Sequence, residues 1–114
     1  YKIEDLIIFY NSFTIKEKVL FKICFDTCHV FASGYDIVDA YEQIQKETNK
    51  AINVIHLNNS KNEIGSKKDR HECITLGYIP IQKIIDFVNI VDENITIIIE
   101  TPSSNLIDDF IIFI

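Results

Sequence analysis

The fold is decided by a short apolar run in the middle of the chain, Ile52-Asn53-Val54-Ile55-His56-Leu57. The run is short and rich in β-branched residues, which indicates a buried strand. We expect two further apolar runs to be strands as well, Val19 to Asp26 and Ile95 to Glu100. The stretches between the runs are long enough to hold a helix, as the crossover between parallel strands requires. The sequence therefore predicts an α/β fold with a parallel sheet.

Apolar residues at helical spacing predict helices before, between and after these strands. We expect helices at the beginning of the chain (Ile3 to Tyr10), at residues 38–50 with Asp36 as N-cap, after Pro80 as the first helical residue, and from Leu106 to Ile114. Both ends of the chain are expected to be cut, which predicts a fragment of a larger domain. Three or four α/β units are too few for an eight-stranded barrel of about 250 residues. An open sheet and a partial barrel both remain open from this pattern.

Composition limits the classes of function. The net charge of −6 and the pI near 4.9 argue against a protein that holds nucleic acid by bulk positive potential. That argument weakens if bound divalent cations neutralise several carboxylates. Three cysteines without a secretory signal favour an intracellular protein, with nucleus and cytoplasm both open. No apolar run approaches the roughly 20 residues that cross a bilayer, so we expect no membrane partner.

Each of the three apolar runs has a potential metal ligand at or next to its end, namely Asp26, His56 and Glu100. In α/β folds the chemistry collects at the carboxyl ends of the strands. Two carboxylates and an imidazole delivered there are ligands for zinc or manganese. The sequence therefore predicts that these side chains bind one ion.

A second set of ligands lies close by in the sequence. His29 follows Asp26 by three residues, and Asp69 and His71 lie in the long connection from Asn58 to Ile79. Residues two apart in an extended chain project to the same side, so both of the loop residues can reach one ion. Two ions about 3.5–4 Å apart suit in-line displacement at a phosphodiester.

Each of these signals also has an ordinary structural interpretation. A histidine at a strand end is commonly a hydrogen-bonded structural residue, and an aspartate there commonly caps the next element. We expect Cys24, Cys28 and Cys73 to be buried or half-buried non-ligands, since they lack C-x-x-C spacing. The basic residues of the long connection fit either a solvated loop or a lip that positions a phosphate backbone: Lys61, Lys67, Lys68 and Arg70.

Three segments resemble motifs of endonuclease IV-type AP endonucleases. Cys24 to Asp36, CFDTCHVFASGYD, is similar to the family's C-x-D-T-C-H-x-F-A-A-G-Y-D. His56 to Lys61, HLNNSK, followed by Gly65-Ser66 and Asp69-Arg70-His71, resembles H-L-N-D-S-K…G-S-x-x-D-R-H. Ile99-Glu100-Thr101-Pro102 is similar to L-E-T-P.

The resemblance implies the C-terminal part, about three β/α units, of a TIM (β/α)8 barrel of the xylose-isomerase-like type. Residues 1–114 would then belong to one partial barrel domain, with no second domain. It further implies a zinc enzyme of DNA base excision repair that hydrolyses the phosphodiester 5′ to an abasic site and leaves a 3′-hydroxyl. The implied partners are double-stranded DNA with abasic sites and the missing N-terminal half of the barrel.

The family's ligands carry over onto the same residues. The resemblance implies one zinc held by Asp26, His56 and Glu100, a second held by His29, Asp69 and His71, and a DNA backbone held by Arg70 with Lys61, Lys67 and Lys68. Of the family's three zincs, at most two are supported by this chain, with Mn²⁺ as an alternative metal. We therefore expect the isolated fragment to be inactive.

Two departures and two alternatives remain. Asn59 replaces the family's aspartate, which would weaken support of the metal ligands, and Leu76 to Pro80 departs from a G-x-G-x-I-G pattern. The alternatives are a divalent-metal sugar isomerase or epimerase of the same barrel superfamily and a catalytically inactive zinc-binding barrel fragment.

Overall fold

A computed structural model describes residues 2–101 of the chain. The helices are α1 (Ile3–Asn11), α2 (Ile15–Leu20), α3 (Thr27–Ala32), α4 (Ile37–Glu47) and α5 (Ile81–Ile90). The strands are β1 (Ile23–Asp26), β2 (Ile52–Leu57), β3 (Asn59–Ser60), β4 (His71–Glu72) and β5 (Thr96–Ile99). The helix expected from Leu106 to Ile114 lies outside the described residues.

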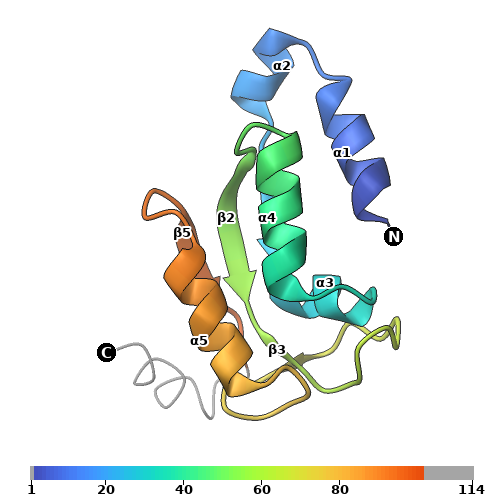
Figure 1. The fold of residues 1–114 in the computed structure, drawn as a ribbon, viewed down its shortest axis with the longest axis vertical. Coiled ribbons are helices and arrows are strands. Elements are labelled where there is room, and N and C mark those ends of the chain that lie inside the picture. Colours follow the sequence, from blue (N-terminus) through green and yellow to red (C-terminus); the bar gives the residue numbers. More distant parts are fainter. Residues whose placement is uncertain (1, 102–114) are drawn as a thin grey trace.

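The main sheet has three parallel strands with β2 in the centre, flanked by β1 and β5 (Figure 1). Asp26 lies opposite His56, and Leu57 lies opposite Ile99. The three strands therefore end at one edge, which we call the carboxyl edge. This arrangement confirms the predicted α/β fold and its parallel sheet.

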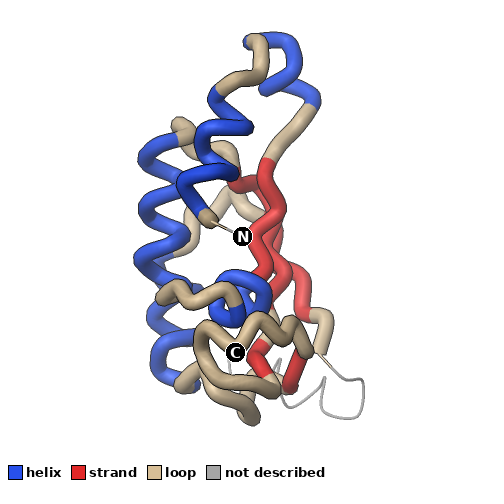
Figure 2. The backbone as a smooth tube through the Cα atoms, turned by 90° about the vertical axis from the view of Figure 1, so that its right-hand side faces the viewer, coloured by secondary structure: helices blue, strands red, loops and turns tan. Residues whose placement is uncertain are grey.

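Helices α1, α4 and α5 cover one face of the sheet (Figure 2). The core between them contains a cluster of three rings. Phe25 stacks on Phe87 with ring centroids 5.6 Å apart, and Tyr41 meets both rings edge to face. Cys24 and Ile98 point to the other face and are exposed. Helices on one face only are what a segment of a barrel wall provides.

The strand expected from Val19 to Asp26 is correct only in its last four residues. Val19 and Leu20 belong to α2 instead and are exposed. A capping box explains the helix: Thr14 Oγ1 accepts a bond from the Glu17 amide, and the Glu17 carboxylate accepts one from the Thr14 amide. This local signal outweighs the apolar character of the run.

The three expected helices that lie within residues 2–101 are confirmed, with shifted ends. Helix α4 begins after Asp36 as expected but ends at Glu47, because Asn49 and Lys50 adopt left-handed backbone angles. Pro80 is the N-cap of α5 rather than its first helical residue. Cys24, expected to be buried or half-buried, is exposed.

The two connections at the carboxyl edge contain structure that the sequence did not indicate. The segment after Asp26 forms helix α3 rather than a turn. The long connection from Asn58 to Ile79 contains β3 and β4, which pair antiparallel. Among residues 2–101 no helix is long and apolar enough to cross a membrane.

Candidate metal centre

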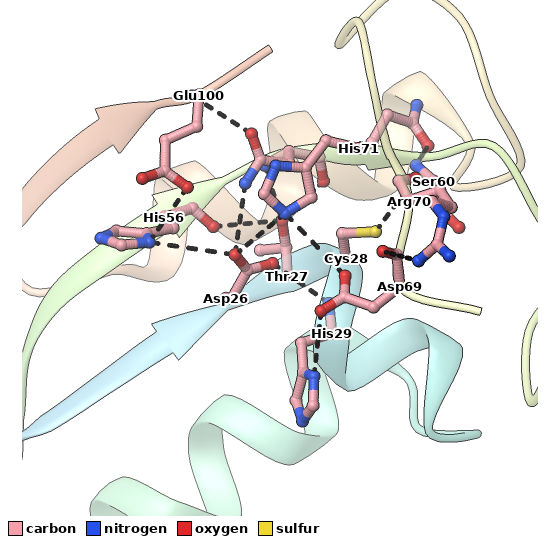
Figure 3. A network of polar contacts seen from close by, with 12 residues as sticks. Asp26, Thr27, Cys28, His29, His56, Ser60, Asp69, Arg70, His71 and Glu100 are labelled. Carbon is pink, nitrogen blue, oxygen red and sulfur yellow. Dashed lines mark hydrogen bonds and ion pairs between the residues drawn. The ribbon is translucent and has the colours of Figure 1, made fainter. Parts of the chain in front are cut away.

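Asp26, His56 and Glu100 meet at the carboxyl edge, each from the end of a different strand (Figure 3). We call them the strand-end group. His56 Nδ1 lies 3.1 Å from Glu100 Oε2 and 3.9 Å from Asp26 Oδ2. One donor atom from each side chain lies within 4.8 Å of the others. This donor set fits a divalent ion such as zinc or manganese, because imidazole and carboxylate are ligands that both metals accept.

A second set of possible ligand atoms comes from α3 and the long connection. Cys28, Asp69 and His71 also have donor atoms within 4.8 Å of one another, and we call them the loop group. His71 Nε2 lies 3.8 Å from Asp69 Oδ1 and 3.4 Å from Asp26 Oδ2. The two groups therefore adjoin at Asp26.

His29 approaches the loop group from its outer side. Its Nδ1 lies 3.1 Å from Asp69 Oδ2, so the Asp69 carboxylate stands between the imidazoles of His29 and His71 (Figure 3). Cys28 was expected to be a non-ligand, yet its thiol takes the place beside Asp69 and His71. The geometry thus brings all six sequence-predicted ligands to one edge of the sheet and adds a cysteine next to them.

Local hydrogen bonds explain the orientation of Asp26. Its Oδ1 accepts the His29 amide at 3.1 Å and so caps α3. This cap leaves Oδ2 turned toward His56 and His71. One carboxylate therefore both starts a helix and takes part in the centre.

The long connection is fixed to α3 by backbone bonds. The Gly65 amide donates to the Phe31 carbonyl at 3.1 Å, and the Lys67 amide donates to the Ala32 carbonyl at 2.9 Å. Lys67 reaches this bond with a left-handed φ of 60°. Beyond it, the pairing of Ser60 with His71 sets the position of the His71 side chain.

Asn59 holds the far side of the same connection. Its amide nitrogen donates to the carbonyls of Ile74 and Ile79, and its Oδ1 accepts the amides of Ser60 and Ile79. An aspartate could not make the two donated bonds. These four bonds all go to backbone groups of the long connection, so the expected weakening of ligand support does not follow from them.

Gly77 passes directly over Asn59. Its φ is 112°, and an added Cβ would lie 2.6 Å from the Ser60 carbonyl oxygen and 2.7 Å from Asn59 Oδ1. A larger residue would displace the connection. Within the departure from Leu76 to Pro80, the glycine is therefore required by the structure.

Sequence reasoning missed two buried polar residues at the carboxyl edge, Thr27 and Asn58. Thr27 Oγ1 donates to the Asn58 carbonyl at 2.6 Å and accepts the Asn58 amide at 2.9 Å. The Asn58 side chain bonds to Asp26 and to the Glu100 amide. The available signal was a pair of polar residues placed directly after apolar strands.

Burial dominates the electrostatics of the centre. It raises the pKa of Asp26, while the bond from the His29 amide and the histidines His71 and His56 oppose that rise. Burial also raises the pKa of the Cys28 thiol, to about 12. Cys28 is therefore a thiol at neutral pH, and its Sγ lies 3.4 Å from the Arg70 carbonyl oxygen as a donor.

The four basic residues proposed for DNA contact are all exposed, namely Lys61, Lys67, Lys68 and Arg70. Lys67 lines a cavity of about 280 Å³ together with His29 and Asp69. Arg70 Nη1 donates to the carbonyl of Asp69 at 3.1 Å. Lys67 and Arg70 thus lie beside Asp69 of the loop group.

Comparison with known proteins points to a single family. The family model of xylose isomerase-like TIM barrels matches residues 13–110. Probable endonuclease 4 of Mycoplasmopsis agalactiae is 50% identical over 88 residues, which cover 72% of this chain and 31% of the relative. Probable endonuclease 4 of Bacillus cytotoxicus is 37% identical over 105 residues, which cover 87% of this chain and 35% of the relative.

A solved structure agrees with these relatives. The crystal structure of endonuclease IV from Thermus thermophilus superposes with a TM-score of 0.64 at 26% identity, over 81% of this chain and 37% of that chain. The chain therefore spans about a third of the proteins it matches. It belongs to the xylose isomerase-like TIM-barrel family and resembles the endonuclease 4 proteins within it.

Proposed function

We propose that this chain supplies part of the zinc site of an apurinic/apyrimidinic endonuclease of DNA base excision repair. The complete protein would hydrolyse the phosphodiester 5′ to an abasic site in double-stranded DNA. The chain would contribute the C-terminal part of a single barrel domain. The remaining barrel strands would complete the substrate site, and the protein would act inside the cell.

One observation carries this proposal: the strand-end group and the loop group adjoin at Asp26, with His71 Nε2 3.4 Å from its Oδ2. Two adjoining ligand sets suit two-metal displacement at phosphorus. We assign one zinc to Asp26, His56 and Glu100. We assign a second to His29 together with Asp69 and His71 of the loop group, with Cys28 as a neighbouring non-ligand. The approach of His29 and His71 to opposite oxygens of Asp69 supports the second assignment.

The expected reaction is hydrolysis at phosphorus. The oxygen of a water molecule bonds to the phosphorus, the bond from phosphorus to the 3′-oxygen breaks, and that oxygen takes up a proton to become the 3′-hydroxyl. Zinc, when bound, supplies Lewis-acid stabilisation of the charge that develops on these oxygens and activates water. The whole enzyme would hold three zincs, of which this chain can hold two, and Mn²⁺ is an alternative ion.

The chain's own residues have separate roles in this scheme. Asp26, held by the cap of α3, keeps one oxygen directed at the centre. The exposed Arg70 and the lysines Lys61, Lys67 and Lys68 would contact the DNA backbone. Their position beside the loop group offsets the overall negative charge locally.

The test uses the full-length protein, loaded with zinc, and a duplex with one abasic site. We expect incision that leaves an extendable 3′-hydroxyl, abolished by His56→Ala. The control Asn53→Ala changes an exposed residue on the same strand and should leave incision intact. Lys67→Ala should weaken DNA binding and flatten its dependence on salt.

Two outcomes would contradict the proposal. An abasic duplex left intact by a protein that interconverts an aldose and a ketose would favour the isomerase alternative. A protein that binds zinc yet transforms neither substrate would favour the inactive barrel fragment.

A further inference from the structure

We propose that Asn58 is the positioning residue of the strand-end group, holding Asp26 and Glu100 at a fixed separation from the central strand. The inference rests on the proposed function in one respect, namely that this group binds a metal. It concerns a residue that touches two of the ligand residues through two different bonds.

The side chain of Asn58 bonds to residues at the ends of both outer strands. It is fully buried, with 0% of its surface exposed. Its Nδ2 donates to Asp26 Oδ2 at 3.3 Å, and its Oδ1 accepts the backbone amide of Glu100 at 3.1 Å. Because Asp26 ends β1 and Glu100 follows β5, one amide connects the two outer strands at the level of the ligands.

The backbone of Asn58 is itself fixed. The main-chain pairing of β2 with β5 ends at Leu57 and Ile99, so Asn58 lies one residue beyond it. At this position Thr27 holds the backbone of Asn58, because its hydroxyl bonds to both the amide and the carbonyl of Asn58. Two buried side chains therefore extend the sheet's hydrogen bonding past the ends of the strands.

The chemistry of these contacts suits an amide. Asp26 offers only acceptors when ionised, whereas the Glu100 amide offers only a donor. The Asn58 side chain serves both, because it donates at Nδ2 and accepts at Oδ1. An aspartate would keep the bond from Glu100 and lose the bond to Asp26, and an aliphatic residue would lose both.

Asn59 is a matched control on the neighbouring position. It is also an asparagine, with 1% of its surface exposed, and it also bonds through both amide atoms. Its partners are backbone groups of the long connection rather than the strand-end group. Alanine at 58 and at 59 therefore removes the same side chain from two different networks.

The experiment titrates the full chain with Co²⁺ and follows its visible absorption. Asn58→Ala should weaken binding to the strand-end group roughly 10- to 100-fold and leave the loop group's affinity unchanged. Asn59→Ala should spare the strand-end group. Circular dichroism checks that each variant is folded.

A metal-free readout separates this inference from the proposed function. Hydrogen exchange of the Glu100 amide should become faster in Asn58→Ala. It should stay slow in Asn58→Asp, which retains the oxygen that accepts this amide. Because aspartate is close to asparagine in size, Asn58→Asp also serves if the alanine variant does not fold. Equal cobalt affinity in Asn58→Ala and wild type would overturn the inference. Unchanged exchange of the Glu100 amide in Asn58→Ala would also overturn it. The same holds for an equal loss of cobalt affinity at both groups in Asn58→Ala and Asn59→Ala.

The wild type distinguishes the two claims. A wild-type chain that binds no cobalt would contradict the metal centre of the proposed function. The Glu100 exchange of the metal-free variants would then decide the role of Asn58 by itself.

Discussion

On the helical side of the sheet, Asp36 caps α4 and bonds to Lys83 of α5, with 2.9 Å between Oδ2 and Nζ. At the carboxyl edge, Asp26 caps α3 but turns its other oxygen toward two histidines. Both aspartates begin a helix. Only Asp36 has a permanently cationic partner in direct contact.

The pKa values of the two carboxyl groups move in opposite directions. Partial burial opposes ionisation of Asp36, but the bond from Lys83 and the amides of Asp39 and Val38 outweigh it and lower the pKa. Burial prevails at Asp26 and raises the pKa. The helical layer thus uses charge for stability, whereas the carboxyl edge concentrates charge that the metal-free fold does not favour.

The largest expected effect on stability lies in the helical layer. Phe87 is fully buried and stacks on Phe25, so Phe87→Ala should lower the free energy of unfolding by about 3–5 kcal/mol. Urea denaturation measures the loss. Ile90→Ala, at an exposed position of the same helix, is the control and should change stability little. A loss of similar size in both variants would contradict the packing described for the core.

The next effect belongs to the carboxyl edge. Zinc at about 100 times its dissociation constant should raise the free energy of unfolding by about 2.7 kcal/mol for each site that it fills, because it binds the folded state. His56→Ala should remove most of the part of this gain that comes from zinc binding at the strand-end group. Thermal denaturation with zinc and with a chelator measures it. An undiminished gain in the variant would mean that zinc stabilises the chain elsewhere.

Asp36→Ala should have a moderate effect. It removes the N-cap of α4, whose Oδ1 accepts the amides of Val38 and Asp39, and should cost about 1 kcal/mol. Lys83→Ala leaves the cap intact and should cost less, since it removes only a surface ion pair. The reverse order of the two losses in urea denaturation would contradict the capping role.

The Asp36–Lys83 pair predicts that the stability of the fold depends on pH. Since the pKa of Asp36 is lower in the folded chain, its ionisation stabilises the fold fully above its unfolded pKa of about 3.9. This stability is lost as the pH falls through the lower, folded pKa. Asp36→Asn should therefore be less stable than wild type at pH 7, and the difference should shrink in acid.

The smallest effect should have the opposite sign. Asp26→Asn keeps a residue that can cap α3 but removes a charge whose burial is unfavourable. The metal-free variant should be at least as stable as wild type at pH 7, and it should bind zinc less tightly. Denaturation in a chelator tests the first expectation, and a less stable metal-free variant would remove the contrast with Asp36.

Much of the carboxyl edge followed from the sequence because strand periodicity is a local signal. The run Ile52 to Leu57 forms a strand with the predicted bounds, and the strand ends bring Asp26, His56 and Glu100 together. Three of the six predicted ligands could be found because they are chemically distinctive residues at the ends of apolar runs, and the other three because they are histidines or a neighbouring aspartate in the connections that follow. Their assignment as ligands remains a prediction.

The errors arose where the outcome depended on competing or distant contacts. Val19 and Leu20 look like strand residues, but the capping box that starts at Thr14 places them in a helix. For Asn58 the only local signal is its place directly after an apolar strand, because its importance depends on neighbours 32 and 42 residues away in the sequence. The β3–β4 pairing joins two residues at each end of a loop, which are too few for periodicity to register.

The proposed function depends above all on two adjoining metal sites at the carboxyl edge. Its most direct test is elemental analysis of the purified chain after zinc loading and removal of loosely bound metal, beside His56→Ala, His71→Ala and the double variant. We expect close to two zincs in the wild type, one in each single variant and none in the double variant. Zinc content unchanged by both substitutions, or no specific zinc in the wild type, would contradict it.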